Sequence, residues 1–243
     1  MKFTRPVTTR IEDFDHHGCT KPEAILSYLE NAADRHSASV SDDTIRKSLG
    51  GTAWILTQWR VEVITPPTWQ DSLFVETWVV DKGASVRSHR QFLLKHADGT
   101  ILVRAEATLA LLDLVSRKVR RISEALVKCY HAEDEAVFAG ELPRMPEPTG
   151  ETEAFAMTLR RGDLDFNGHV HNLRYLELAM EALPEEVCRT RRITALRIAY
   201  RVPLMAGDRV RIRAAQSEMQ NDSWDIGIYN DTQLCTLVRL TMG

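Results

Sequence analysis

Residues 163–182, DLDFNGHVHNLRYLELAMEA, decide the fold of this chain when they are laid over residues 13–32, DFDHHGCTKPEAILSYLENA. The two stretches align without a gap, and Asp163 then falls on Asp13. The glycine of each stretch, Gly168 in the second, also matches. Beyond Asp163, the second stretch carries Asp165, two Asn and two His close together, whereas at those five positions the first stretch keeps only the Asp.

A second pair of stretches follows in the same order. Residues 60–77, RVEVITPPTWQDSLFVET, align with residues 197–214, RIAYRVPLMAGDRVRIRA, so that Pro66 meets Pro203. Each match is weak alone, but matches that keep their order in both halves indicate an internal duplication.

Each half predicts the same run of elements: a short strand, a turn with glycine, one long helix and then a series of strands. Pro22 suits the first turn of the first helix, and apolar residues recur behind it at helical spacing. In residues 208–214, DRVRIRA, Arg alternates with Val and Ile, which is the period of a half-buried antiparallel strand. The fold class expected is α+β, with an antiparallel sheet wrapped around a helix in each half.

The domain organisation follows from the duplication. Residues 140–152, GELPRMPEPTGET, contain three Pro and two Gly and few core residues, which is typical of a linker. We therefore expect an N-terminal repeat over residues 1–139 and a C-terminal repeat over residues 153–243.

Composition excludes several classes of protein. Of the 243 residues 44% are hydrophobic and 27% charged, as in ordinary globular proteins, and no apolar run reaches the ~20 residues of a membrane span. The net charge of −3 predicts no general attraction to nucleic acid. The N-terminus has no apolar core of a signal peptide, and the four Cys form no CxxC pair, so a reducing cytoplasmic location is expected.

Two local basic runs depart from this balance: SRKVRR at residues 116–121 and RTRR at residues 189–192. Each is explained either as a solvated charged face or as a contact for a polyanion, such as the phosphates of coenzyme A or an acidic carrier protein. The sequence leaves both alternatives open.

The duplicated plan and the stretch DLDFNGHVHNLRY resemble the acyl-carrier-protein thioesterases of plants and bacteria, which have a double hot-dog fold. The first-half stretches PPTWQDSLFVETWV and RRIS also look like that family. The resemblance implies a tandem hot-dog in which the first repeat shapes the acyl pocket and the second supplies the chemistry. It implies an enzyme of lipid metabolism that hydrolyses fatty acyl-carrier protein to a free fatty acid during fatty acid biosynthesis.

The resemblance carries a proposed catalytic group over to Asp165, Asn167 and His169. Hydrolysis of a thioester needs a base for water and a group that polarises the carbonyl. His169 is suited to take a proton from water, Asn167 to position that water, and Asp165 to orient either side chain. Since Asp and Asn are common helix caps, a structural role for Asp165 and Asn167 is the alternative. If the second helix begins at residues 167–170, the backbone N–H groups of His169 and Val170 would polarise the carbonyl.

One part of the family pattern is missing. Where the plant enzymes carry a Glu-Cys pair after the second helix, this chain has Pro203 and Leu204. Direct attack of water is therefore expected, with no acyl-cysteine intermediate. The alternatives are a thioesterase that acts on acyl-CoA, or a non-catalytic protein that binds acyl thioesters. A dehydratase of the same fold is disfavoured.

No cofactor and no metal are expected, because His169 and His171 have no third ligand nearby in the sequence. The partner expected is the acyl carrier protein with its acyl-phosphopantetheine arm. The oligomeric state, monomer or homo-oligomer, stays open, as does the acyl chain length.

Overall fold

The computed structural model describes residues 1–42, 47, 49–80, 85–140, 142–149, 153–165 and 168–243. The chain forms two compact units, residues Met1–Gly140 and Glu141–Gly243. Among the described residues no helix is both long enough and apolar enough to cross a membrane.

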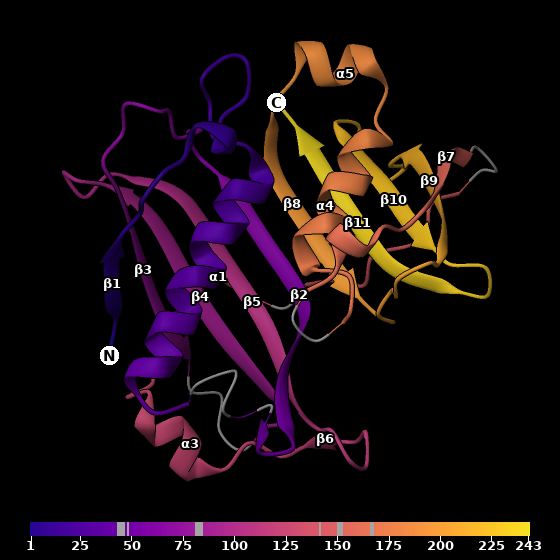
Figure 1. Ribbon diagram of the computed structural model, residues 1–243. Coiled ribbons are helices and arrows are strands. Elements are labelled where there is room, and N and C mark those ends of the chain that lie inside the picture. The colour runs from indigo at the N-terminus through magenta and orange to yellow at the C-terminus, as the bar shows by residue number, and fades with distance from the viewer. Residues whose placement is uncertain (43–46, 48, 81–84, 141, 150–152, 166–167) are drawn as a thin grey trace. The chain divides into compact units, whose positions relative to one another are not determined.

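Unit 1 contains one long helix and a meander of antiparallel strands (Figure 1). Its sheet has the strand order β1-β3-β4-β5-β2, and the short β6 pairs with β5. Figure 1 shows α1 lying along one face of this sheet. The elements are β1 (Phe3–Pro6), η1 (Ile11–Asp13), α1 (Pro22–Ser39), β2 (Thr52–Val63), β3 (Leu73–Val80), β4 (Arg87–His96), β5 (Ile101–Asp113), β6 (Val119–Arg120) and α3 (Glu124–Cys129).

The core of unit 1 lies between α1 and the sheet. Pro22 is the first residue of α1, as predicted, because a proline at that position loses no helical hydrogen bond. Leu26 and Leu29 are fully buried on the helix, and Val75 is fully buried on β3. The apolar residues at helical spacing therefore form the buried face that the sequence predicted.

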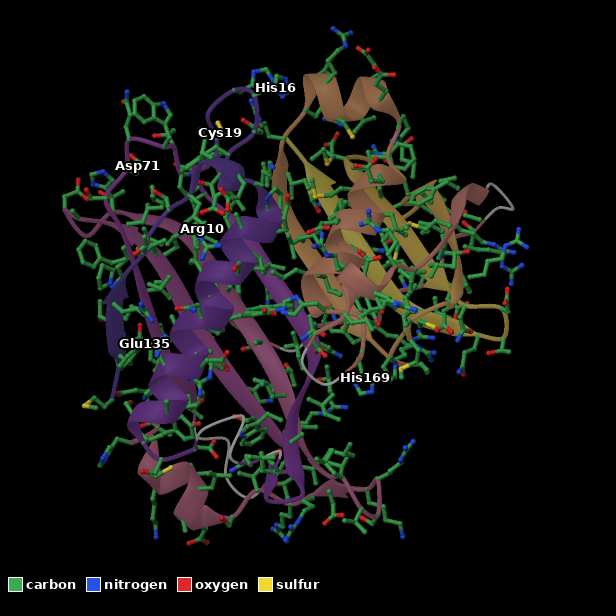
Figure 2. All side chains as sticks on the ribbon, in the orientation of Figure 1. Arg10, His16, Cys19, Asp71, Glu135 and His169 are labelled. Carbon is green, nitrogen blue, oxygen red and sulfur yellow. The ribbon has the colours of Figure 1, made fainter. Side chains whose placement is uncertain are left out.

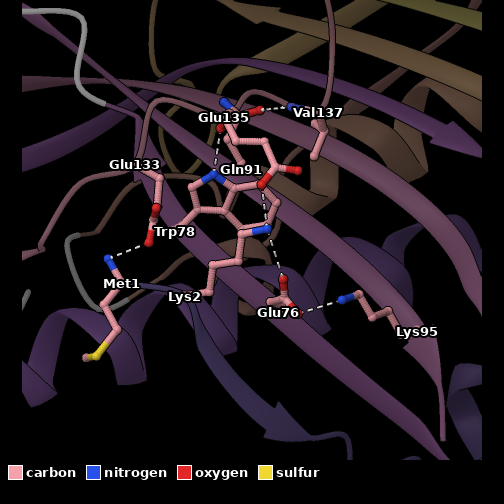
Figure 3. Close-up of polar contacts among 9 residues, drawn as sticks. All are labelled: Met1, Lys2, Glu76, Trp78, Gln91, Lys95, Glu133, Glu135 and Val137. Carbon is pink, nitrogen blue, oxygen red and sulfur yellow. Dashed lines mark hydrogen bonds and ion pairs between the residues drawn. The ribbon is translucent and has the colours of Figure 1, made fainter. Parts of the chain in front are cut away.

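The segment of residues 133–137 crosses the other face of the unit 1 sheet (Figure 3). The Trp78 indole Nε1 donates to the Glu135 carbonyl oxygen at 2.7 Å, and the Val137 N–H donates to Gln91 Oε1 at 3.0 Å. Lys2 forms an ion pair with the Glu135 carboxylate at 2.7 Å. These bonds explain how Trp78 can be fully buried although its side chain points away from α1.

Unit 2 repeats the plan with the strand order β8-β11-β10-β9-β7, and its helix α4 packs against β9, β10 and β11. The predicted alternation in β9 is confirmed, since Val210 and Ile212 are fully buried. The tandem hot-dog of the α+β class is therefore confirmed. The elements are β7 (Glu153–Thr158), η2 (Arg161–Asp163), α4 (Asn172–Glu181), α5 (Glu185–Thr190), β8 (Ile193–Tyr200), β9 (Arg209–Gln216), β10 (Ser223–Tyr229) and β11 (Leu234–Met242).

The second helix is shorter than predicted. Whereas α1 has 18 residues, α4 has 10 and ends at Glu181, and α5 follows after a break. The cause is Pro184, because a proline disfavours helical geometry in the residue before it.

The described residues of the expected linker run along the edge of unit 2 near β8. The Arg197 guanidinium donates to the Pro143 carbonyl oxygen at 2.6 Å, and Arg201 pairs with Glu147 at 3.2 Å. Met145 is only 6% exposed, so this stretch supplies a core residue that its composition did not predict.

Candidate functional site

The candidate site lies on the turn that precedes α4. The Asp165 N–H donates to the His169 carbonyl oxygen at 2.8 Å, and the Gly168 N–H donates to the Asp165 carbonyl oxygen at 3.1 Å. Gly168 has a φ of 76°, in the left-handed region that a glycine adopts without strain. The glycine is therefore needed for the shape of the turn.

The first repeat has the same turn. The Asp15 N–H donates to the Cys19 carbonyl oxygen at 2.8 Å, and Gly18 has a φ of 75°. The Asp15 carboxylate also accepts from the Cys19 N–H at 3.0 Å, as the Asp165 carboxylate accepts from the His169 N–H at 3.3 Å. The described residues of the two turns thus make the same backbone hydrogen bonds, and the turns differ in the side chains that they carry.

Each turn is bonded to the segment that follows the first long strand of its repeat. The Val170 N–H donates to the Leu204 carbonyl oxygen at 2.9 Å, and the Thr20 N–H donates to the Pro67 carbonyl oxygen at 2.7 Å. The donor residues of the two bonds are aligned in sequence, and so are the acceptor residues, which supports the inferred duplication.

The helix α4 begins later than predicted. Its first residue is Asn172, and His171 is the N-cap, whose ring Nδ1 accepts from the Leu173 N–H at 3.4 Å. The Val170 N–H, expected at a free helix terminus, is already bonded to Leu204. The Val170 amide therefore already has a backbone acceptor, and its predicted role in polarising a substrate carbonyl stays a prediction.

The structure describes two of the three residues of the predicted catalytic group, and Asn167 lies outside the described residues. His169 is exposed on the turn before α4 (Figure 2). The Asp165 carboxylate accepts from the His169 backbone N–H, so Asp165 fixes the backbone from which the imidazole projects. The two residues are therefore brought together through the turn.

Asp163 stabilises the segment that leads into the turn, and no functional or structural role was predicted for it from the sequence. It is 4% exposed, and its carboxylate accepts from the Arg160 backbone N–H at 2.8 Å and from the Arg160 guanidinium at 3.0 Å. The hydrogen bond from Arg160 holds the pKa of the Asp163 carboxyl below its usual value. The alignment of Asp163 with Asp13 was the signal that could have identified it, because Asp13 makes the same backbone bond to Arg10.

Tyr175 and Tyr200 brace the start of α4. The Tyr175 hydroxyl accepts from the Leu204 N–H at 2.8 Å, and the Tyr200 hydroxyl donates to the Asn172 carbonyl oxygen at 3.1 Å. These two bonds hold the start of α4 against β8 and the segment that follows it.

The positions of the missing Glu-Cys pair provide neither base nor nucleophile. Pro203 is exposed, and Leu204 is fully buried with both of its backbone groups bonded. Burial raises the pKa of the thiols of Cys188 and Cys235, which disfavours the thiolate that a nucleophile needs. Cys19, at the position of the first repeat that corresponds to His169, is half-buried.

Within the described part of the chain, no group of His, Cys, Asp or Glu side chains is arranged to hold a metal ion. The chemistry available at the turn is therefore that of an exposed imidazole next to a carboxylate that orders the backbone. An exposed imidazole at this position can take a proton from water.

Comparison with known proteins places both halves of the chain in one family. Residues 1–130 match the acyl-ACP thioesterase N-terminal domain and residues 147–235 match the acyl-ACP thioesterase C-terminal domain.

Three curated plant relatives illustrate the range of similarity. The chain is 26% identical to the chloroplastic oleoyl-acyl carrier protein thioesterase 1 of Arabidopsis thaliana, a match that covers 90% of this chain and 66% of that protein. It is 25% identical to the chloroplastic dodecanoyl-[acyl-carrier-protein] hydrolase of Cinnamomum camphora, over 83% of this chain and 56% of that protein. With a chloroplastic acyl-[acyl-carrier-protein] hydrolase of Cuphea viscosissima it shares 27% identity, and that match spans 46% of the relative. The chain thus spans about half the length of the curated relatives it matches.

Solved structures share the fold along the whole chain. An acyl-ACP thioesterase from Bacteroides thetaiotaomicron has a TM-score of 0.89 at 19% identity, with 100% of this chain and 98% of that chain covered. The 12:0-ACP thioesterase from Umbellularia californica has a TM-score of 0.88 at 22% identity, with 100% and 97% covered. With both of its halves matched by the corresponding domains, the chain belongs to the acyl-ACP thioesterase family.

Proposed function

We propose that this protein hydrolyses fatty acyl-carrier protein to a free fatty acid and the carrier thiol, as part of fatty acid biosynthesis. The observation that carries the proposal is the turn of the second repeat, which keeps Asp165 and His169 on a backbone shared with the first repeat. Family membership of both halves supports it, as do the relatives named acyl-carrier-protein hydrolases.

In the proposed reaction His169 is the general base. Its imidazole takes a proton from a water molecule, and the resulting hydroxide attacks the thioester carbonyl carbon. The carbon–sulfur bond then breaks, and the leaving thiolate receives the proton from the imidazolium. Asp165 is a positioning residue, because its carboxylate holds the backbone N–H of His169. Asn167, outside the described residues, remains proposed as the group that positions the water.

The His169 N–H is proposed as the donor that polarises the carbonyl. Its contact with Asp165 is 3.3 Å long, at the weak end of N–H···O distances, whereas the Val170 N–H makes a 2.9 Å bond to a backbone carbonyl. Because the 3.3 Å contact engages the N–H only weakly, we propose that a thioester oxygen shares this N–H with the Asp165 carboxylate, which continues to hold the turn.

The proposed setting is a reducing compartment, with the acyl carrier protein as partner. The four cysteines are all free, which fits the cytoplasm.

The second candidate function is the binding of acyl thioesters without turnover. It is favoured by Pro203 and Leu204, which stand where the resembled enzymes carry their Glu-Cys pair. It predicts tight binding of acyl-carrier protein with no release of thiol.

The test is thiol release from acyl-carrier protein and from acyl-CoA of the same chain length, over several chain lengths. We expect turnover with acyl-carrier protein, and loss of a general base in His169→Ala should lower kcat by about 10²-fold or more. The matched control is Cys19→Ala, because Cys19 occupies the equivalent position of the first turn. Unchanged turnover in His169→Ala would overturn the mechanism, and binding without turnover in the wild-type protein would establish the second candidate.

A further inference from the structure

The two basic runs of the chain differ in the structure, although their sequences look alike. In the run at residues 189–192, Arg189 pairs with Glu186 at 2.6 Å and Arg191 pairs with Asp222 at 2.7 Å. These charges are neutralised by neighbouring carboxylates within unit 2. The run at residues 189–192 is therefore a surface of balanced charge.

The run at residues 116–121 is not neutralised in this way. Its four cations, Arg117, Lys118, Arg120 and Arg121, are all exposed. Within the described residues only Arg120 has a carboxylate within ion-pair distance, Asp113 at 3.7 Å. Since the whole chain has a net charge of −3, this accumulation of unpaired positive charge is local.

A rigid hairpin presents these cations. β5 ends at Asp113, and its carboxylate accepts from the N–H groups of Val115 at 3.1 Å and Ser116 at 2.8 Å and from the Ser116 hydroxyl at 3.0 Å. These bonds hold the pKa of the Asp113 carboxyl below its usual value, so it stays ionised and keeps the turn closed. The chain returns as β6, with Val119 opposite Leu112.

Arg117 at the tip of this hairpin has a φ of 55°, a left-handed conformation that is unfavourable for a residue with a side chain. This left-handed residue lies in the turn by which the chain reverses between β5 and β6. Figure 1 shows β6 at the end of unit 1 where α3 lies, and Figure 2 shows the turn with His16 and Cys19 at the opposite end.

Exposed aliphatic side chains accompany the cations. Val115 is 89% exposed and Val119 is 53% exposed. A cationic surface with a few aliphatic contacts fits a protein surface rich in carboxylates. It fits a membrane less well, because interfacial anchors use Trp or Phe and residues 113–121 contain no aromatic residue.

We propose that the hairpin of residues 113–121 is the docking surface for the acidic face of the acyl carrier protein. The inference rests on the proposed function, because that function supplies the carrier protein as partner. Arg117, Lys118 and Arg121 supply the charge, and Val115 supplies apolar contact at the tip. Docking there concentrates the carrier on the protein without any role in bond breaking.

The experiment measures the dissociation constant of labelled holo-acyl carrier protein for the full chain by fluorescence anisotropy. We compare Arg117→Gln/Lys118→Gln with Arg189→Gln/Arg191→Gln, two variants that lose the same formal charge. Loss of two interfacial charge contacts should weaken binding about five- to thirty-fold in the hairpin variant, and the control should change less than about two-fold. The salt dependence of binding should also become shallower in the hairpin variant alone.

Equal weakening in the two variants, or in neither, would overturn the proposal. Hairpin-dependent binding to phosphatidylglycerol vesicles, with no hairpin-dependent binding of the carrier protein, would assign the surface to a membrane and would also overturn it. Turnover of an acyl-N-acetylcysteamine thioester, a small substrate without a carrier, is measured in parallel. Turnover of the small thioester without hairpin-dependent carrier binding would refute docking and leave the proposed hydrolase intact. Hairpin-dependent carrier binding without turnover would refute the hydrolase and leave docking intact.

Discussion

The Tyr175 hydroxyl accepts a hydrogen bond of 2.8 Å from the Leu204 N–H, and both partners of this bond are absent from the first repeat. The equivalent positions there are Ile25, which has no hydroxyl, and Pro67, which has no N–H. The bond ties the start of α4 to the segment after β8 only in the repeat that carries His169. The bond therefore stabilises the candidate site and is not required by the hot-dog fold in general.

We expect Tyr175→Phe to lower the free energy of unfolding by about 1–3 kcal/mol, because the Leu204 N–H would be left buried without its acceptor. Urea denaturation measures the change. Tyr229→Phe is the control, since that hydroxyl makes no hydrogen bond to the described residues, and it should change stability by less than about 0.5 kcal/mol. Equal losses in the two variants would show that the bond to Leu204 is not the cause.

Variants of the two equivalent aspartates, Asp15 and Asp165, distinguish an effect on stability from an effect on catalysis. The Asp15 carboxylate accepts from the N–H groups of His17 and Cys19, at 2.8 and 3.0 Å, so Asp15→Ala should cost about 1–3 kcal/mol of stability with kcat unchanged. Asp165→Ala should lower kcat as well, because Asp165 positions His169. Denaturation curves and thiol release on both variants test this. A fall of kcat in Asp15→Ala as large as that in Asp165→Ala would contradict it.

A buried histidine predicts how stability depends on pH. His36 is fully buried, and its ring Nδ1 accepts from the Arg90 guanidinium at 3.1 Å. Burial, together with the charge of Arg90, lowers the pKa of His36 to about 4. In the unfolded chain the imidazole has a pKa near 6.5, so between about pH 6.5 and 4 protons bind the unfolded state and not the native state.

Stability should therefore be complete above about pH 6.5 and should fall by about 3 kcal/mol from this group as the pH decreases to 4. His36→Gln cannot be protonated, so its free energy of unfolding should depend less on pH across this window. Urea denaturation at several pH values, on both proteins, isolates the difference because all other titrating groups are shared. Identical pH dependence would show that His36 is not held neutral by the fold.

The fold was predictable because its signals are local and occur twice. The alternation of Arg with Val210 and Ile212 predicts strand β9 without any other part of the chain. Pro22 before an apolar helical face predicts the start of α1 in the same way. The early end of α4 also has a local signal, Pro184, which the prediction of one long helix in each half did not use.

The parts of the site that were not predicted depend on contacts between distant residues. The sequence 167–172 offers more than one start for a helix, and the bond of the Val170 N–H to Leu204 settles which residue begins it. The buried cluster around His36 is similar. The Tyr130 hydroxyl donates to Asp42 at 2.6 Å across 88 residues of sequence, a separation that no local pattern records.

The ion pair between Asp225 on β10 and Arg239 on β11 provides a final prediction about unit 2. The Asp225 carboxylate accepts two hydrogen bonds from the Arg239 guanidinium, at 2.6 and 2.8 Å, and the residues are 5% and 8% exposed. Removing one partner leaves a buried charge unpaired, so Asp225→Leu or Arg239→Met alone should cost about 3–5 kcal/mol of stability. The double variant removes both charges and should be more stable than either single variant, because the desolvation cost of the pair disappears with it. Denaturation of the three variants, treated as a double-mutant cycle, measures the coupling, and losses that simply add would show that the two charges act independently.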